Sequence, residues 1–197
     1  TAIATDGSLG GEEARKELAI KRKNEAKIGL KELSDPIFLG FSDGNLHNEL
    51  NAEQEISKLI NKIIPDLIIT HPPEDYHPDH KTLSRFVKNA AGFKCPVLFA
   101  DTLLGVNFIP EFYVDTTKYF EQKKEAIMAH KSQNPKKFLD ATEILNRFRA
   151  AQCNAPEGHY AESYRYEKSF PFADIRDLLP SSPVYRPYYK NLKNSLI

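Results

Sequence analysis

One short apolar run constrains this chain more than any other feature, because prolines bound it and it leads directly into a cluster of histidines and acids. The run is Asp66–Thr70, with Pro65 before it and Pro72 and Pro73 after it. Its length and β-branched residues predict a buried strand that ends in a loop. The loop, residues 71–80, reads His-Pro-Pro-Glu-Asp-Tyr-His-Pro-Asp-His. Potential metal ligands therefore follow a predicted strand directly, where α/β proteins usually place their sites.

A helix is predicted to begin inside this loop, at Pro78. Proline suits the first helical position because its missing N–H would be unsatisfied there anyway. His77 then caps the helix, Asp79 is its second residue and His80 its third. Residues three apart share a helix face, so the two histidines can converge on one ligand or one metal ion. An isolated His-x-x-His pair also fits ordinary capping or surface histidines, but its place after a strand favours a functional site.

Segments with strand and helix character alternate along the chain. Strands are expected at residues 36–41, 66–70, 96–100 and 112–115, and helices at 12–33, 52–64, 78–92, 118–130 and 136–151. The chain also begins within a strand-like segment. This alternation predicts an α/β fold with a mainly parallel sheet flanked by helices. We expect a single domain over residues 1–197, with an irregular tail from about residue 180 that is rich in proline and tyrosine.

The composition argues for a small-molecule ligand. Lys plus Arg number 27, as do Asp plus Glu, so the formal net charge is zero and no attraction to nucleic acid or acidic membranes is predicted. No apolar run is long enough for a transmembrane segment and no signal peptide is visible, so we expect a cytoplasmic protein. Cys95 and Cys153 are too few for a disulfide scaffold, and we expect both to be buried.

Several motifs together resemble the LmbE/PIG-L zinc-dependent de-N-acetylases. The resemblance rests on the order and spacing of the motifs, which span most of the chain from Thr5 to Arg165. The motifs are Thr5-Asp6-Gly7 with Gly10-Gly11, Arg15-Lys16-Glu17-Leu18, His77-Pro78-Asp79-His80, Lys124-Glu125-Ala126-Ile127 with His130-Lys131-Ser132-Gln133, and Ala161-Glu162-Ser163-Tyr164-Arg165.

The resemblance implies a Rossmann-like domain in three layers that carries one zinc ion and hydrolyses the N-acetyl group of an amino sugar conjugate such as an N-acetylglucosamine compound. His80 would be a zinc ligand. His77 would stabilise the oxyanion or protonate the leaving amine, and Asp79 would orient and charge His77. A carboxylate here suits that role because a helix N-terminus disfavours imidazolium. Asp79 could instead simply complement the helix dipole. A homo-oligomer would also fit the resemblance.

The resemblance also implies substrate-binding roles for Arg15 and Asp43. An arginine after the glycine-rich loop could hold sugar hydroxyls or polarise the acetyl carbonyl. An exposed helix arginine is an equally ordinary interpretation of Arg15. Asp43 precedes Gly44 in a predicted turn, where aspartate also serves turn chemistry. His130 is placed near the pocket by the resemblance, although a histidine at a helix end also complements the dipole.

One family motif is missing from these residues. Members carry His-Pro-Asp-Asp-Glu after their first strand, which supplies two zinc ligands and the general base, and nothing in residues 1–197 matches it. Catalytic zinc ordinarily needs three protein ligands. A cluster of His71, Asp75 and His77 is a poor substitute, since the prolines after His71 should carry it away from the helix. We expect that the first strand lies outside this sequence, because its loss would expose an apolar sheet edge.

Two other classes remain as alternatives. A catalytically inactive glycan-binding homologue would keep Arg15 and Asp43 but lack the metal. A nucleotide-sugar enzyme would share the alternating elements, but neither a Gly-x-Gly-x-x-Gly motif nor a Gly-Lys-Ser/Thr phosphate loop is present.

Overall fold

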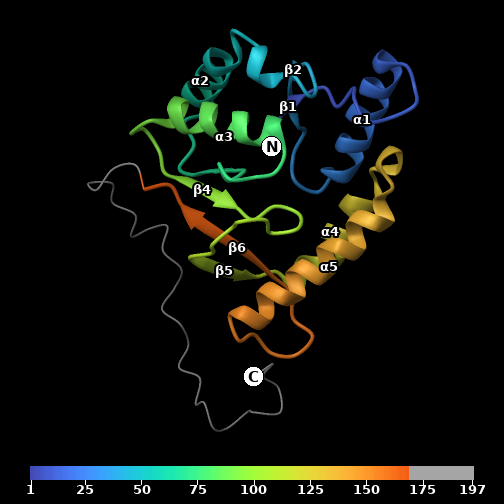
Figure 1. Cartoon of the computed structure of the whole chain (residues 1–197), viewed down its shortest axis with the longest axis vertical. Coiled ribbons are helices and arrows are strands. Elements are labelled where there is room, and N and C mark those ends of the chain that lie inside the picture. The colour runs from blue at the N-terminus through green and yellow to red at the C-terminus, as the bar shows by residue number, and fades with distance from the viewer. Residues whose placement is uncertain (169–197) are drawn as a thin grey trace.

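The computed structural model describes residues 1–168, so the predicted tail from residue 180 lies outside the described residues. Helices and strands follow one another in the predicted order and alternate as far as the fourth strand (Figure 1). The strands are β1 Ala2–Thr5, β2 Ile37–Phe41, β3 Ile68–Thr70, β4 Val97–Ala100, β5 Phe112–Asp115 and β6 Ala161–Tyr166. The α-helices are α1 Arg15–Gly29, α2 Ala52–Ile63, α3 Pro78–Ala91, α4 Phe120–Met128 and α5 Pro135–Gln152. Single turns of 3₁₀ helix occur as η1 Leu46–Asn48, η2 Thr117–Tyr119 and η3 Lys131–Gln133.

The strands form two sheets, in the orders β1-β2 and β3-β4-β6-β5. The pairs β1–β2 and β3–β4 are parallel, as βαβ units require, whereas β6 runs antiparallel to both β4 and β5. The predicted α/β class with helices flanking a sheet is confirmed. The parallel part is limited to the first four strands, because β6 returns to the sheet after α5 in the opposite direction.

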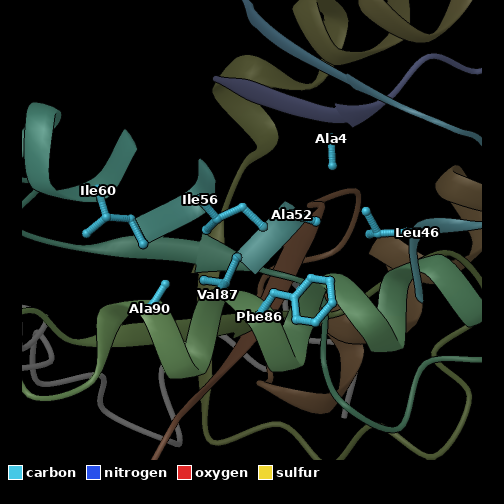
Figure 2. Close-up of a cluster of buried hydrophobic side chains, with 8 residues drawn as sticks. All are labelled: Ala4, Leu46, Ala52, Ile56, Ile60, Phe86, Val87 and Ala90. Atoms are coloured by element: carbon cyan, nitrogen blue, oxygen red, sulfur yellow. The ribbon is translucent and has the colours of Figure 1, made fainter. Parts of the chain in front are cut away.

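The main core lies where α2 and α3 pack on each other and on the strands of both sheets. Figure 2 shows Ile56 and Ile60 from α2 facing Phe86 and Val87 from α3, with Ala4 of β1 above them. Half-buried side chains from β2 and β3 complete the cluster. The helical spacing of the apolar residues in α2 and α3 directs both apolar faces into this one core. These two helices therefore hold the two sheets together.

An apolar groove separates β1 from β3. It encloses about 600 Å³ and is lined by residues of both strands and by side chains of α2 and α3. Among the described strands, β1 pairs only with β2 and β3 only with β4, so each keeps one unpaired edge. Ile69 of β3 lines the groove and is 56% exposed. Among the described strands, the sheet is thus interrupted between β1 and β3.

The composition led us to expect that both cysteines are buried and that no segment is long and apolar enough to span a membrane. Cys95 and Cys153 form no disulfide with each other and are half-buried rather than fully buried, because each lies at the margin of a small core cluster. No helix among residues 1–168 combines the length and the apolar character that crossing a bilayer requires.

Candidate active site

The carboxyl ends of β1, β2 and β3 open into a cavity of about 950 Å³. That volume is in the range of small-molecule sites. Its lining mixes apolar side chains with a few acids, bases and histidines drawn from α1, α3 and the loops after the strands. The polar lining residues are Thr5, Asp6, Arg22, Lys23, Asp43, Tyr76, His77, Asp79, His80, His130, Ser132, Gln133 and Asn134.

The start of α3 has the predicted form. Pro78 is the first helical residue and His77 is the N-cap, with extended backbone angles. The backbone N–H of Asp79 donates to Nδ1 of His77 over 3.2 Å. Because Nδ1 accepts, the proton of the neutral ring lies on Nε2. His77 therefore presents an N–H donor rather than a base.

His80 is held by a buried carboxylate. Its Nδ1 lies 3.1 Å from Oδ2 of Asp75, whose side chain is 0% exposed. The backbone N–H of His77 donates to the other oxygen of Asp75 over 2.8 Å. Burial opposes ionisation of Asp75, yet the N–H of His77, the Thr102 hydroxyl and His80 together hold the pKa of Asp75 below its ordinary value. This arrangement leaves Nε2 of His80 for a ligand, as in metal sites where a carboxylate orients the histidine.

The expectation that prolines carry His71 away from the helix is wrong. Its ring stacks on that of His80, with 3.9 Å between centroids. The chain turns back after Pro72, since the backbone N–H of Asp75 donates to the carbonyl of Pro72. Burial, reinforced by the neighbouring His80, lowers the pKa of His71 to about 4. His71 is thus a neutral, half-buried ring, and its buried Nδ1 has no hydrogen-bond partner among the described residues.

The described residues alone do not make a zinc site. No group of three or more His, Cys, Asp or Glu side chains within residues 1–168 has the arrangement to hold a metal ion. The three histidine rings are close, but His71 lies face to face with His80, and stacked rings cannot direct their nitrogens at one ion. Among the described residues His80 is the one histidine of this group supported by a carboxylate, whereas catalytic zinc takes three ligands from the protein.

Asp79 has other partners than the sequence suggested. Its carboxylate, in a residue only 4% exposed, accepts from the backbone N–H of Gly44 over 2.7 Å and of Leu46 over 3.1 Å. Its contact with His77 runs through its own backbone N–H. Asp79 therefore ties α3 to the turn after β2 and positions His77 through the helix start.

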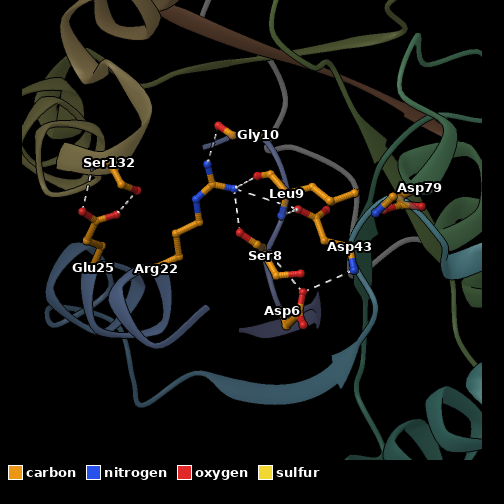
Figure 3. Close-up of polar contacts among 11 residues, drawn as sticks. Asp6, Ser8, Leu9, Gly10, Arg22, Glu25, Asp43, Asp79 and Ser132 are labelled. Carbon is orange, nitrogen blue, oxygen red and sulfur yellow. Dashed lines mark hydrogen bonds and ion pairs between the residues drawn. The ribbon is translucent and has the colours of Figure 1, made fainter. Parts of the chain in front are cut away.

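Asp43 lines the cavity and joins two loops. Its Oδ2 accepts from the backbone N–H of Leu9 over 2.9 Å and lies 3.9 Å from the guanidinium of Arg22. Figure 3 shows Arg22 reaching from α1 to the glycine-rich loop, where it donates to the carbonyls of Gly7, Leu9 and Gly10. Gly7 and Gly10 have φ of +67° and +77°, which glycine adopts without strain.

Arg15 is the predicted site residue that the structure leaves outside. It is the first residue of α1, is exposed, and does not line the cavity. Arg22, two turns further along the same helix, lines the cavity instead. Arg22 and Glu25 were not among the residues predicted from the sequence. Their spacing of three residues on one helix face is the signal that could have revealed them.

The comparisons with known proteins agree with this geometry. The family model for PIG-L, described as GlcNAc-PI de-N-acetylase, matches residues 1–91, which include β1, the glycine-rich loop and the His77–His80 motif. Over these residues the chain resembles the PIG-L family. The chain is 29% identical to diacetylchitobiose deacetylase from Thermococcus kodakarensis over 190 residues, which cover 83% of this chain and 70% of the relative.

Solved structures show the same fold. N,N'-diacetylchitobiose deacetylase from Pyrococcus horikoshii superposes with a TM-score of 0.71 at 19% identity, covering 90% of this chain and 76% of that one. GalB, the 4-carboxy-2-hydroxymuconate hydratase of Pseudomonas putida, superposes with a TM-score of 0.68 at 18% identity, covering 84% and 78%. A deacetylase and a hydratase share this architecture, so the fold alone does not decide the reaction.

Proposed function

We propose that this protein is a zinc-dependent hydrolase that removes the N-acetyl group from an N-acetylglucosamine-type amino sugar conjugate. The observation that carries the proposal is the placement of His80 in the wall of the cavity, with Nδ1 held by buried Asp75. Among the residues on the cavity wall, His80 alone has this carboxylate support, which orients and strengthens metal-binding histidines. The family match and the deacetylase relative support the same chemistry.

Zinc at His80 would supply a Lewis acid and an activated water. One described ligand is too few, so we propose that the other ligands and the general base come on an apolar strand of the same gene product that fills the groove between β1 and β3. Two buried polar atoms of residues that line the groove support the proposal of an inserted strand. They are Nδ1 of His71 and Oδ1 of Asp101, and each lacks a hydrogen-bond partner among the described residues. Unpaired buried polar atoms are costly, and a strand inserted here could satisfy them.

His77 acts as a hydrogen-bond donor in this proposal. Its Nδ1 accepts from the Asp79 backbone, so Nε2–H is free to stabilise the oxyanion of the tetrahedral intermediate. A neutral donor at a helix N-terminus avoids the unfavourable interaction between imidazolium and the positive end of the helix dipole. Protonation at Nδ1 would break the cap, which favours the oxyanion role over transfer of a proton to the amine.

The sugar would occupy the cavity between α1 and α3. Asp43 retains Oδ1 to accept from a sugar hydroxyl, since Oδ2 is already engaged with Leu9. Phe38 and Phe138 give the cavity apolar surface for the faces of the sugar rings. A mixed lining of this kind suits a small, neutral, polar ligand.

The test is zinc content by elemental analysis together with acetate release from N,N'-diacetylchitobiose, on this chain and on the longest polypeptide that its gene encodes. Zinc and acetate are expected in the longer form. His80→Ala should lose both, His77→Ala should keep zinc but lose acetate release, and His47→Ala, an exposed histidine away from the cavity, should match the wild type.

An inactive glycan-binding protein is the second candidate, favoured by one observation: no three-ligand group is found within residues 1–168. It would bind chitobiose in the same cavity without zinc and without acetate release. Saturable binding of the sugar to both forms, with neither zinc nor acetate in either, would establish this candidate and overturn the first.

A further inference from the structure

Two oppositely charged residues of α1 hold the loops on two sides of the cavity. Arg22 donates to the carbonyls of the glycine-rich loop, and Glu25, three residues later, accepts from the loop that joins α4 to α5. Both side chains lie on the same face of α1, and Figure 3 shows them directed at different loops. One helix face therefore positions two cavity walls that are far apart in sequence.

Glu25 makes the contact to the second loop with both carboxylate oxygens. Oε1 accepts from the backbone N–H of Ser132 over 2.8 Å, and Oε2 accepts from its hydroxyl over 2.7 Å. Glu25 is 6% exposed, and 107 residues separate the two partners. A buried carboxylate engaged twice by one residue strongly constrains that residue, because losing the partner would leave a charge buried.

The loop held by Glu25 contributes directly to the cavity. His130, Ser132, Gln133 and Asn134 all line it. Besides the bonds to Glu25, the backbone hydrogen bonds of this loop are local, such as Gln133 N–H to the carbonyl of His130. The long-range hydrogen bonds that attach the loop to α1 are thus those of Glu25.

His130 packs against α1 at Gly29. A Cβ at Gly29 would lie 3.3 Å from Nε2 of His130 and 3.0 Å from the carbonyl oxygen of Ala126, so any larger residue would crowd this approach. Nδ1 of His130 is buried and has no hydrogen-bond partner among the described residues. The ring lines the cavity, and a ligand hydroxyl that reached Nδ1 would remove the cost of leaving this atom buried without a partner.

We propose that Glu25 is a positioning residue for substrate recognition: through Ser132 it fixes the loop so that His130 hydrogen-bonds a hydroxyl of the bound sugar. Naming the ligand as a sugar rests on the proposed function, whereas the positioning of the loop does not. The contact comes from the loop that joins α4 to α5 and not from the His77–His80 motif at the start of α3, so it governs affinity for the sugar more than the chemical step.

The positioning is tested by amide hydrogen exchange of residues 130–134 in the full polypeptide. Glu25→Ala should speed exchange of the Ser132 amide at least tenfold, and Glu25→Gln, which keeps one acceptor oxygen, should be intermediate. Glu17→Ala, an exposed acid on the same helix, is the control. Unchanged exchange in Glu25→Ala would overturn the proposal whether or not the protein is an enzyme. If Glu25→Ala does not fold, Ser132→Ala takes its place in the test. This variant removes only the hydroxyl bond to Glu25, so the exchange rate of the amide at residue 132 should rise by a smaller factor.

The recognition step is tested by calorimetric binding of N,N'-diacetylchitobiose to zinc-depleted protein. Glu25→Ala and His130→Ala should each weaken binding about five- to tenfold, the loss expected for one hydrogen bond. The double variant should be no weaker than His130→Ala alone, because both act through one contact. Additive losses would mean that Glu25 acts independently of His130 and would overturn the inference. If wild-type protein does not bind the sugar, the proposed substrate is wrong, while hydrogen exchange still decides the positioning.

Discussion

The carboxylate of Asp79 lies 2.7 Å from the backbone nitrogen of Gly44, a residue 35 positions earlier in the chain. With Leu46, whose N–H donates to the other oxygen, this contact fastens the start of α3 to the turn after β2. The histidine motif is therefore held by the neighbouring strand connection as well as by its own helix.

Replacing Asp79 with alanine should destabilise the protein by about 2 kcal/mol or more, because the N–H groups of Gly44 and Leu46 lose their acceptors. Urea unfolding would measure the loss, and Asp66→Ala, outside this network, serves as the control. A variant of normal stability with a displaced pH profile for acetate release would instead indicate that Asp79 acts chiefly on the charge of His77.

Asp75→Asn should weaken zinc binding by the full polypeptide about 10- to 100-fold, since the carboxylate that orients His80 is lost. Titration with a competing chelator would measure the affinity. Asp35→Asn, at an exposed position, should bind zinc normally. Equal affinities in the two variants would argue that Asp75 has only a structural role.

Two arginines on α1 provide a matched pair. Arg22→Met should lower stability by about 1.5–3 kcal/mol, because a side chain only 13% exposed loses its bonds to the carbonyls of Gly7 and Leu9. Arg15→Met, at the exposed first residue of the helix, should change stability by about 0.5 kcal/mol at most. In kinetic assays Arg22→Met should raise KM. If Arg15→Met raised KM more than Arg22→Met did, the substrate-binding role predicted for Arg15 from the sequence would stand.

Acid sensitivity should depend on Glu162. Burial opposes ionisation of Glu162, but the charge and hydrogen bond of Lys123 and the hydroxyl of Tyr164 hold its pKa below the ordinary 4.5. A lowered folded-state pKa means that the unfolded chain binds protons more readily. The stabilisation is therefore complete above pH 4.5 and is lost as pH falls through the lower folded-state value.

Glu162→Gln should accordingly lose less stability than the wild type between pH 5 and pH 3, measured as the urea midpoint at each pH. Glu17→Gln on the exposed face of α1 should retain the wild-type slope. Parallel curves for wild type and Glu162→Gln would show that other carboxyl groups dominate acid unfolding.

The groove between β1 and β3 gives a stability test in the longest polypeptide from the gene. If a strand fills the groove there, Ile69→Lys buries a charge and should destabilise by several kcal/mol. Ile144→Lys, on α5 and 70% exposed, should be nearly neutral. Similar small effects of both substitutions would mean that the groove stays open to solvent and that no strand occupies it.

The local elements of this protein follow from its sequence because their signals are short-range. Pro65 and the β-branched run predict β3, and Pro78 after His77 predicts where α3 begins; the structure shows β3 at Ile68–Thr70 and His77 as the cap. The candidate site could be located from the same signals, since a loop that follows a parallel strand must open at the carboxyl edge of the sheet.

The partners of each side chain were decided by the tertiary structure. Asp79 is directed at Gly44, Glu25 at Ser132 and His71 at His80, and these contacts depend on how loops from different strands meet at one edge. Periodicity and capping report on neighbours within a turn or two, whereas packing brings together residues up to 107 positions apart. Sequence thus determined which elements form and which residues could do chemistry, and the packing of α1 and α3 decided which of them share the cavity.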